Sequence, residues 1–366
     1  MEAGNGQNRE GNSPAGNTDG SQGGSPGGSP RRSRTRGLLI GGAIVGVLLF
    51  LTVGTIALVL LIGPGGSNGG RGSGGGGSAE PPETFREKYV SGDGPDKVAV
   101  LPVVGTISTT TTPTSAAATP ETLSDQLRQA EEDERVKAVV LEVDSPGGGV
   151  VPTDEMYRSI QEFKETTGLP VVISMGQTAA SGGYYIATAA DRIVANENTL
   201  TGSLGVIFSY LNFAEAAAEY GIEEEVIKSG PFKDIGSSTR EPTEEELEIL
   251  QSYVDESYDG FVEVIVEGRG LPEEEVRDLA DGRVYSGLQA ESLGLVDELG
   301  DLERAAEVST KLAGLDDATV VRYQRRAPGI TELLQTRLAP PEPEALQVLE
   351  AAGLSPTPEL QYVYRP

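Results

Sequence analysis

The fold is decided by the stretch VKAVVLEVDSPGGG, residues 136–149. Residues 136–143 are mostly apolar, which is typical of a strand buried on both faces of a parallel sheet. The three glycines that end the stretch allow backbone N–H groups to approach a ligand closely, as in an oxyanion hole or an anion cradle. The alternative is an ordinary strand-to-helix turn, for which Pro-Gly is a common sequence. A P-loop is excluded, because no Gly-Lys-Ser/Thr follows at the required spacing.

Strands and helices alternate on both sides of this stretch. Further apolar strands are predicted at 98–104, 169–175, 192–195 and 204–208, and helices at 120–133, 153–166, 180–190 and 243–267. The last helix begins with Thr243-Glu244-Glu245-Glu246, which matches a capping box. Two shorter helical stretches bracket residues 282–287, and the chain from Val320 is Pro-rich and irregular. The alternation predicts an α/β fold whose largely parallel sheet is covered by helices on both faces.

A membrane anchor is predicted before the folded part. Residues 1–36 are rich in Gly, Ser, Asn and Pro and are expected to be disordered. Residues 37–63 carry no charge, and their length exceeds the roughly 20 residues that span a bilayer. Arginines 31, 32, 34 and 36 place the N-terminus in the cytoplasm and the later residues outside it. A cleaved signal peptide is the alternative, but the apolar run is too long for one.

The composition excludes several classes of protein. The 366 residues carry a net charge of −28 and contain no Cys, no His and no Trp. A disulfide framework, a thiol nucleophile, a Ser-His-Asp triad and a His-ligated zinc site are therefore excluded. Nucleic-acid binding is disfavoured because it needs a basic surface. No metal motif is present, and we expect no cofactor. The acid excess and the few lysines are typical of a salt-in halophile, in which molar salt screens the self-repulsion.

A second glycine-rich turn carries a serine. Residues 178–185 read TAASGGYY and join the strand at 169–175 to the next helix. The hydroxyl of Ser181 lies among small residues, and the N–H of Gly182 at the helix start suits an oxyanion. In the alternative reading Ser181 is only a helix N-cap. Two such turns close together in the chain favour a serine hydrolase.

A serine nucleophile needs a base, and without histidine a lysine is the best substitute if burial lowers its pKa from about 10.4. Five of the seven lysines are disfavoured because they lie beside the linker, at strand starts or on polar helix faces: Lys88, Lys97, Lys137, Lys164 and Lys311. Lys228 and Lys233 remain, in IKSGPFKDIG, residues 227–236. Spacing does not choose between them.

A set of motifs resembles one known family. It consists of DSPGGG (144–149), ASGGYY (180–185), LTGSLGV (200–206), KSGPFKD (228–234) and GLVDELG (294–300). Their combination and order resemble the signal peptide peptidase A family of Ser/Lys peptidases, in its short single-domain form, over roughly residues 95–315. The resemblance implies a ClpP/crotonase-like fold of repeated strand–strand–helix units, here preceded by one transmembrane helix. Resemblance to haloarchaeal proteins points to the same source as the composition.

The family resemblance also implies roles for individual residues. Ser181 is implied as the nucleophile, Lys233 as the general base, and Ser203 as the side chain that orients the lysine. The N–H groups of Gly148 and Gly182 are implied as the oxyanion hole, with Gly147 as an alternative to Gly148. Members of the family form homo-oligomeric rings or domes, so the serine and lysine of neighbouring subunits can complete one site.

The expected protein is a membrane-anchored serine endopeptidase that degrades cleaved signal peptides or other membrane-associated peptides. Its parts are a disordered segment (1–36), an anchor (37–63), a linker (64–83), a peptidase domain (84–319) and a tail (320–366). The domain lies outside the cytoplasm, and peptides and the membrane are its partners. Alternatives are a related protease with one membrane-protein substrate and a non-catalytic crotonase-like scaffold. A CoA-thioester enzyme is disfavoured because an extracytoplasmic domain lacks ready access to CoA.

Two further expectations concern regulation and conditions. The end of the tail, LQYVYRP (360–366), is extended and can lie in a substrate groove like a cleavage product. Deleting residues 355–366 then raises activity, whereas a strand that seals the fold edge is the alternative. The net charge of −28 favours a protonated lysine, so we expect activity to need high salt and to rise toward alkaline pH.

Overall fold

The structure is a computed structural model, and it describes residues 85–109, 117–325 and 359–364. These residues belong to one compact unit, Ala79–Pro366. The disordered segment, the anchor and the linker predicted over residues 1–83 lie outside the described residues. Within the described part, none of the helices combines the length and apolarity that a membrane span requires.

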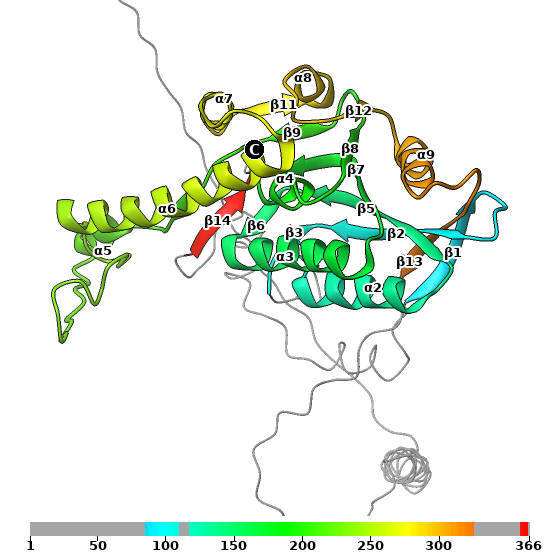
Figure 1. The fold of residues 1–366 in the computed structure, drawn as a ribbon. Helices are drawn as coiled ribbons and strands as arrows, with labels where there is room; N and C mark the ends of the chain where they lie inside the picture. Colours follow the sequence, from blue (N-terminus) through cyan, green and yellow to red (C-terminus); the bar gives the residue numbers. More distant parts are fainter. Residues whose placement is uncertain (1–84, 110–116, 326–358, 365–366) are drawn as a thin grey trace, which may run out of the picture. The chain divides into compact units, whose positions relative to one another are not determined.

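A large, mostly parallel sheet forms the centre of the fold (Figure 1). Its strand order is β1 (Arg86–Ser91), β13 (Thr319–Gln324), β2 (Lys97–Val104), β5 (Val136–Ser145), β7 (Val171–Ala180), β8 (Arg192–Ala195) and β12 (Glu298–Leu299). Neighbours from β13 to β12 run parallel, and β1 pairs antiparallel with β13 at one edge. The C-terminal end of β7, past the residues that pair with β8, pairs with β9 (Leu200–Gly202). The other partner of β9 is β11 (Val284–Ser286). The predicted α/β architecture with a largely parallel sheet is confirmed.

Helices cover both faces of this sheet, as the apolar strands require. One face packs against α2 (Pro120–Glu132), α3 (Val150–Thr167), α4 (Gly182–Ala187) and the second half of α6 (Glu244–Arg269). The other face packs against α9 (Leu302–Leu312). Successive side chains of β2 divide between the faces: Ala99 and Leu101 join the first core, and Val98 and Val100 join the second. Two short helices, α7 (Glu273–Leu279) and α8 (Gly287–Ser292), contribute Val276 and Ala290 to the first core.

A second, small sheet contains the glycine stretch. Its strand order is β10 (Ile207–Ser209), β14 (Glu359–Val363), β6 (Gly147–Gly149), β3 (Thr106–Ile107) and β4 (Ala117–Ala118). The glycines that the sequence suggested as a turn are therefore a strand between the end of β5 and the start of α3. This strand leaves one backbone edge free to pair with the tail strand β14.

Several predicted boundaries need correction. The predicted strand at 204–208 is wrong, because β9 and β10 lie on either side of residues 203–206. The predicted helix at 180–190 shortens to α4, because pairing with β9 extends β7 to Ala180. The irregular tail predicted from Val320 is wrong at its start, because β13 crosses that boundary and pairs with both β1 and β2. The capping box at Thr243 is confirmed by both of its hydrogen bonds.

Candidate active site

Ser181 occupies a strained turn between β7 and α4. Its φ angle is +53°, in the left-handed region that L-residues avoid. Ser181 is the N-cap residue of α4, but its side chain makes no capping hydrogen bond. The Oγ atom is buried, and the described residues give it no hydrogen-bond partner. A strained backbone and a buried, unpaired hydroxyl both cost stability, which is the pattern expected where chemistry requires the residue.

Ser203 lies beside Ser181 in the structure. The N–H of Ser181 donates to the carbonyl oxygen of Gly202 at 2.8 Å, where β7 pairs with β9. Ser203 has a φ angle of +51°, and its N–H donates to the carbonyl oxygen of Arg283 at 2.7 Å. Among the described non-glycine residues, positive φ angles occur only at Ser181 and Ser203. The two serines implied by the sequence are therefore neighbours with the same unusual backbone.

Glycines bring three backbone segments together next to Ser181. A Cβ atom on Gly147, whose φ angle is +96°, would lie 2.6 Å from the nitrogen of Gly182. A Cβ atom on Gly148 would lie 1.9 Å from the carbonyl oxygen of Ile107. The N–H of Gly147 already donates to Oγ of Ser145 at 3.1 Å. This bond leaves Gly148 as the better candidate oxyanion donor of the two alternatives.

A peptide strand lies along these glycines. In β14, Tyr362 is opposite Gly148 in an antiparallel register, and the N–H of Tyr364 donates to the carbonyl oxygen of Pro146 at 2.7 Å. The carbonyl oxygen of Tyr362 lies 2.0 Å from a Cβ position on Gly147 and 3.1 Å from one on Gly182. The tail therefore places a peptide carbonyl beside Gly147 and Gly182, the residue that follows Ser181.

The side chain of Tyr362 fills an aromatic pocket. Its ring lies 5.0 Å from that of Tyr185 and 4.8 Å from that of Phe261, measured between centroids. Tyr157 packs edge-on against Tyr185 at 5.4 Å. The hydroxyl of Tyr362 donates to the carbonyl oxygen of Ser257 at 2.8 Å. Burial raises the pKa of Tyr362 well above its ordinary value, so the phenol keeps its proton.

Lys233 lies on an exposed segment between α5 (Ala214–Glu219) and α6. This segment and the first half of α6 extend beyond the main sheet (Figure 1). Over the described residues, no hydrogen bond or ion pair joins the ammonium of Lys233 to Ser181, to Ser203 or to any other group. The ammonium of Lys228, in contrast, contacts Asp234 at 2.6 Å and the carbonyl oxygen of Pro231 at 2.9 Å. The fold thus brings the two serines together but does not bring either lysine to them within one chain.

Arg240 holds the residue next to Lys233. Its guanidinium donates to both carboxylate oxygens of Asp234, at 2.9 and 3.0 Å. It also pairs with the buried carboxylate of Glu246, which accepts from the N–H of Thr243 at 2.8 Å. Hydrogen bonds from Arg240 lower the pKa of Asp234, and they lower that of Glu246 to about 2. Sequence reasoning identified Glu246 only as a capping residue and missed the link from α6 to the lysine segment.

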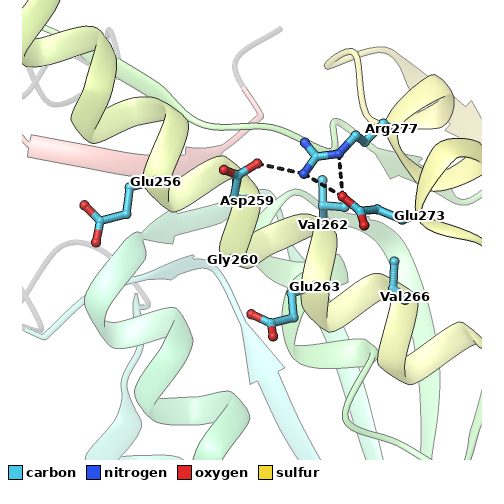
Figure 2. Close-up of a pocket in the computed structure, with 8 residues that line it drawn as sticks. All are labelled: Glu256, Asp259, Gly260, Val262, Glu263, Val266, Glu273 and Arg277. Atoms are coloured by element: carbon cyan, nitrogen blue, oxygen red, sulfur yellow. Dashed lines mark hydrogen bonds and ion pairs between the residues drawn. The ribbon is translucent and has the colours of Figure 1, made fainter.

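The hollow on α6 and α7 is separate from this site. Figure 2 shows Arg277 bridging Asp259 and Glu273 across it, while Glu256 and Glu263 point outward from α6. None of the predicted site residues lines it. Its carboxylates do not form a metal site, since no group of three or more metal-binding side chains occurs in the described ranges.

The sequence of this chain is similar to those of known peptidases. A model of peptidase family S49 matches residues 163–316, a range that includes Ser181, Ser203 and Lys233. A relative from Enterococcus faecium, named for signal peptide peptidase SppA, is 39% identical over 247 residues, covering 65% of this chain and 72% of the relative. A Synechocystis relative named as a putative protease is 42% identical over 220 residues, which cover 60% of this chain and 76% of the relative. The chloroplastic serine protease SPPA of Arabidopsis thaliana is 34% identical over 248 residues, which cover 66% of this chain and 36% of that protein.

Proposed function

The chain belongs to peptidase family S49, and on that premise we propose that it is a membrane-anchored serine endopeptidase. Ser181 is the proposed nucleophile and Lys233 the proposed general base. One observation carries the proposal: a strained serine, whose buried hydroxyl has no partner among the described residues, lies beside glycines that contact the carbonyl of a peptide strand. An extended strand beside a nucleophile is how a peptidase presents a scissile bond.

The proposed reaction is acyl transfer through an ester. The hydroxyl of Ser181 attacks the peptide carbonyl carbon while the lysine amine removes its proton. The N–H groups of Gly148 and Gly182 stabilise the oxyanion that develops. The protonated lysine then gives its proton to the leaving amine, and water hydrolyses the ester to release the second product. Ser203 is proposed to accept or donate a hydrogen bond that orients the lysine.

Lys233 is proposed to act on Ser181 of a neighbouring copy in a homo-oligomeric ring. The segment that carries Lys233 exposes large apolar side chains, which include Tyr220, Ile222 and Ile227. Exposed apolar surface of this kind marks an interaction site. A second copy is the partner that explains both features, because it covers the apolar side chains and supplies the missing base. Lys228 is the weaker candidate, since Asp234 already pairs with its ammonium.

The remaining features of the proposal rest on the sequence. Residues 37–63 are proposed as the anchor, with the N-terminus in the cytoplasm and the peptidase domain, residues 84–319, outside it. A ClpP/crotonase-like fold, a halophilic source and a cofactor-free mechanism belong to the same proposal. The proposed substrates are remnant signal peptides or other membrane-associated peptides, because an anchored domain meets these first.

Two alternatives remain distinct from this proposal. A protease with one dedicated membrane-protein substrate shares the mechanism and differs in the substrate alone. A crotonase-like scaffold needs no nucleophile, and it gives no reason to keep a strained serine whose buried hydroxyl lacks a partner in the part of the chain that the structure describes.

Peptide hydrolysis by the full chain, in mild detergent and molar KCl, tests the proposal. The variants are Ser181→Ala, Lys233→Ala and Lys228→Ala. We expect the first two to be inactive and the third to keep most of the wild-type rate. Activity that survives Ser181→Ala overturns the serine mechanism, whereas a correctly assembled but inactive wild type supports the scaffold.

A further inference from the structure

The ring of Tyr285 lies against the turn that carries Ser203. β11 pairs antiparallel with β9 (Figure 1), so that Tyr285 is opposite Thr201 and Val284 is opposite Gly202. The ring packs on the backbone of Gly202, the residue before Ser203. A Cβ atom on that glycine would lie 2.5 Å from Cδ2 of the ring and 3.2 Å from Cε2. Only a glycine therefore allows the ring to approach the turn this closely.

The residues before Tyr285 hold the same turn through hydrogen bonds. The N–H of Ser203 donates to the carbonyl oxygen of Arg283 at 2.7 Å, and the N–H of Gly282 donates to the carbonyl oxygen of Leu204 at 3.1 Å. The guanidinium of Arg283 also donates to the carboxylate of Asp281, with 2.8 Å between Nε and Oδ1. These contacts explain how Ser203 keeps a φ angle of +51° that a free turn would avoid.

Tyr285 is fixed at its other end by α7. Its hydroxyl donates to the carbonyl oxygen of Leu279, the last residue of that helix, at 2.9 Å. The carbonyl groups in the last turn of a helix lack partners within the helix, so this bond satisfies one of them. The helix is itself packed into the core through Val276, and Tyr285 is only 8% exposed. The ring thus links a packed helix to the turn of Ser203.

We propose that Tyr285 is a positioning residue of the peptidase: its ring holds Gly202 so that the hydroxyl of Ser203 meets the lysine that activates Ser181. The inference rests on the proposed function, in which Ser203 orients that lysine, and it adds a residue to the reaction. Because the hydroxyl of Ser203 moves with its backbone, loss of the ring displaces it. A displacement of about 1 Å in a group of this kind can cost about 100-fold in rate.

A double-mutant cycle on the full chain, in mild detergent and molar KCl, tests the inference. The values of kcat and KM for peptide hydrolysis are measured from pH 6 to 9 for wild type, Ser203→Ala, Tyr285→Leu and the double variant. Tyr285→Phe is also measured, alone and with Ser203→Ala. It keeps the ring on Gly202 and removes only the bond to Leu279, so the cycle can be completed even if Tyr285→Leu does not fold.

The matched control is Tyr323→Leu. Tyr323 is also a buried tyrosine of the main sheet, but it lies in β13, which β2, β5 and β7 separate from β9. The substitution removes the same atoms from the core without touching the turn of Ser203. It should lower the melting temperature by an amount similar to Tyr285→Leu and keep the kcat and the pH–rate profile of wild type.

We expect Tyr285→Leu to lower kcat about 100-fold and to have the pH–rate profile of Ser203→Ala. KM should change little, because a buried ring gives the peptide no surface to bind. Tyr285→Phe should lose about five-fold, the effect of one hydrogen bond. In the Ser203→Ala background both substitutions should change kcat by less than about two-fold, because the group that they position is gone.

Losses that multiply in the double variants overturn the inference, because the ring would then act on another group, such as Ser181 through the carbonyl of Gly202. Wild-type kcat in Ser203→Ala or in both Tyr285 variants, or an equal loss of kcat in Tyr323→Leu, also overturns it. These outcomes leave the proposed function standing. Hydrolysis that survives Ser181→Ala overturns the proposed function itself.

Discussion

The backbone N–H of Ser181 donates a 2.8 Å hydrogen bond to the carbonyl oxygen of Gly202, the residue before Ser203. This bond fixes the spacing of two serines that share a φ angle near +50°. Backbone strain of this kind costs about 1–3 kcal/mol at each position and persists where the surrounding structure imposes it.

Ser181→Gly should be more stable than wild type although it is inactive. Glycine adopts the φ angle of +53° without strain, and the variant removes a buried hydroxyl that has no partner among the described residues. We expect the melting temperature to rise by about 2–4 °C. Ser181→Ala removes the hydroxyl but keeps the backbone strain, so its melting temperature should rise less. A melting temperature of Ser181→Gly below that of Ser181→Ala would show that the turn is not strained.

Arg240 should matter for catalysis although it is far in sequence from Ser181. Arg240→Gln removes the two hydrogen bonds from Arg240 to the carboxylate of Asp234, next to the lysine, and a displacement of about 1 Å can cost about 100-fold in rate. We expect kcat to fall by this order while KM changes little, with partial rescue by Arg240→Lys. The control is Arg277→Gln, which breaks one exposed ion pair from α7 to α6 and one within α7, and it should leave the rate unchanged. Equal losses in both variants would contradict a specific role.

The same cluster should lose its stabilising effect in acid. Because Arg240 lowers the pKa values of Asp234 and Glu246, their contribution is complete above the ordinary carboxyl range near pH 4. It is lost as the pH falls toward about 2, the pKa of Glu246 in the folded chain. The difference in melting temperature between wild type and Arg240→Gln should therefore be constant from pH 5 to 7 and shrink below pH 4.

Deletion of residues 355–366 should increase activity toward added peptides. The tail strand lies between β6 and β10, where a tethered strand in the substrate groove would compete with added peptides. Its removal should lower KM by about ten-fold with little change in kcat. If the strand only seals the edge of the small sheet, the deletion lowers the melting temperature and leaves KM unchanged. Tyr362→Ala in the complete chain should reproduce part of the effect, because it removes the side chain that anchors the tail.

The rate should rise both with salt concentration and with pH, because both changes favour the neutral lysine. The net charge of −28 favours the protonated lysine, whereas a base must be neutral. Molar KCl screens that field, so the rate should rise with salt and between pH 6 and 9. Burial raises the pKa of Tyr362, so release of the tail does not cause the increase. Full activity at pH 6 in low salt would contradict this explanation.

The parallel sheet was predictable because its strands are apolar runs that can only be buried. The glycine strand β6 was not, because Gly147–Gly149 carries no side-chain pattern and becomes a strand through its partners β3 and β14. The aromatic pocket also escaped prediction: Tyr185, Phe261 and Tyr362 are distant in sequence and meet only in the fold. The resemblance named Ser181 and Ser203, and the structure adds their shared strain and the identity of the strand beside them.

The most direct test of the central claim is to trap the covalent intermediate. The full chain is mixed with an activated amino-acid ester in molar KCl, quenched with acid during turnover, digested and analysed by mass spectrometry. We predict one acyl group per active site, attached to Ser181, and none in Ser181→Ala. An acyl group on a different side chain, or ester hydrolysis that continues undiminished in Ser181→Ala, would contradict the account.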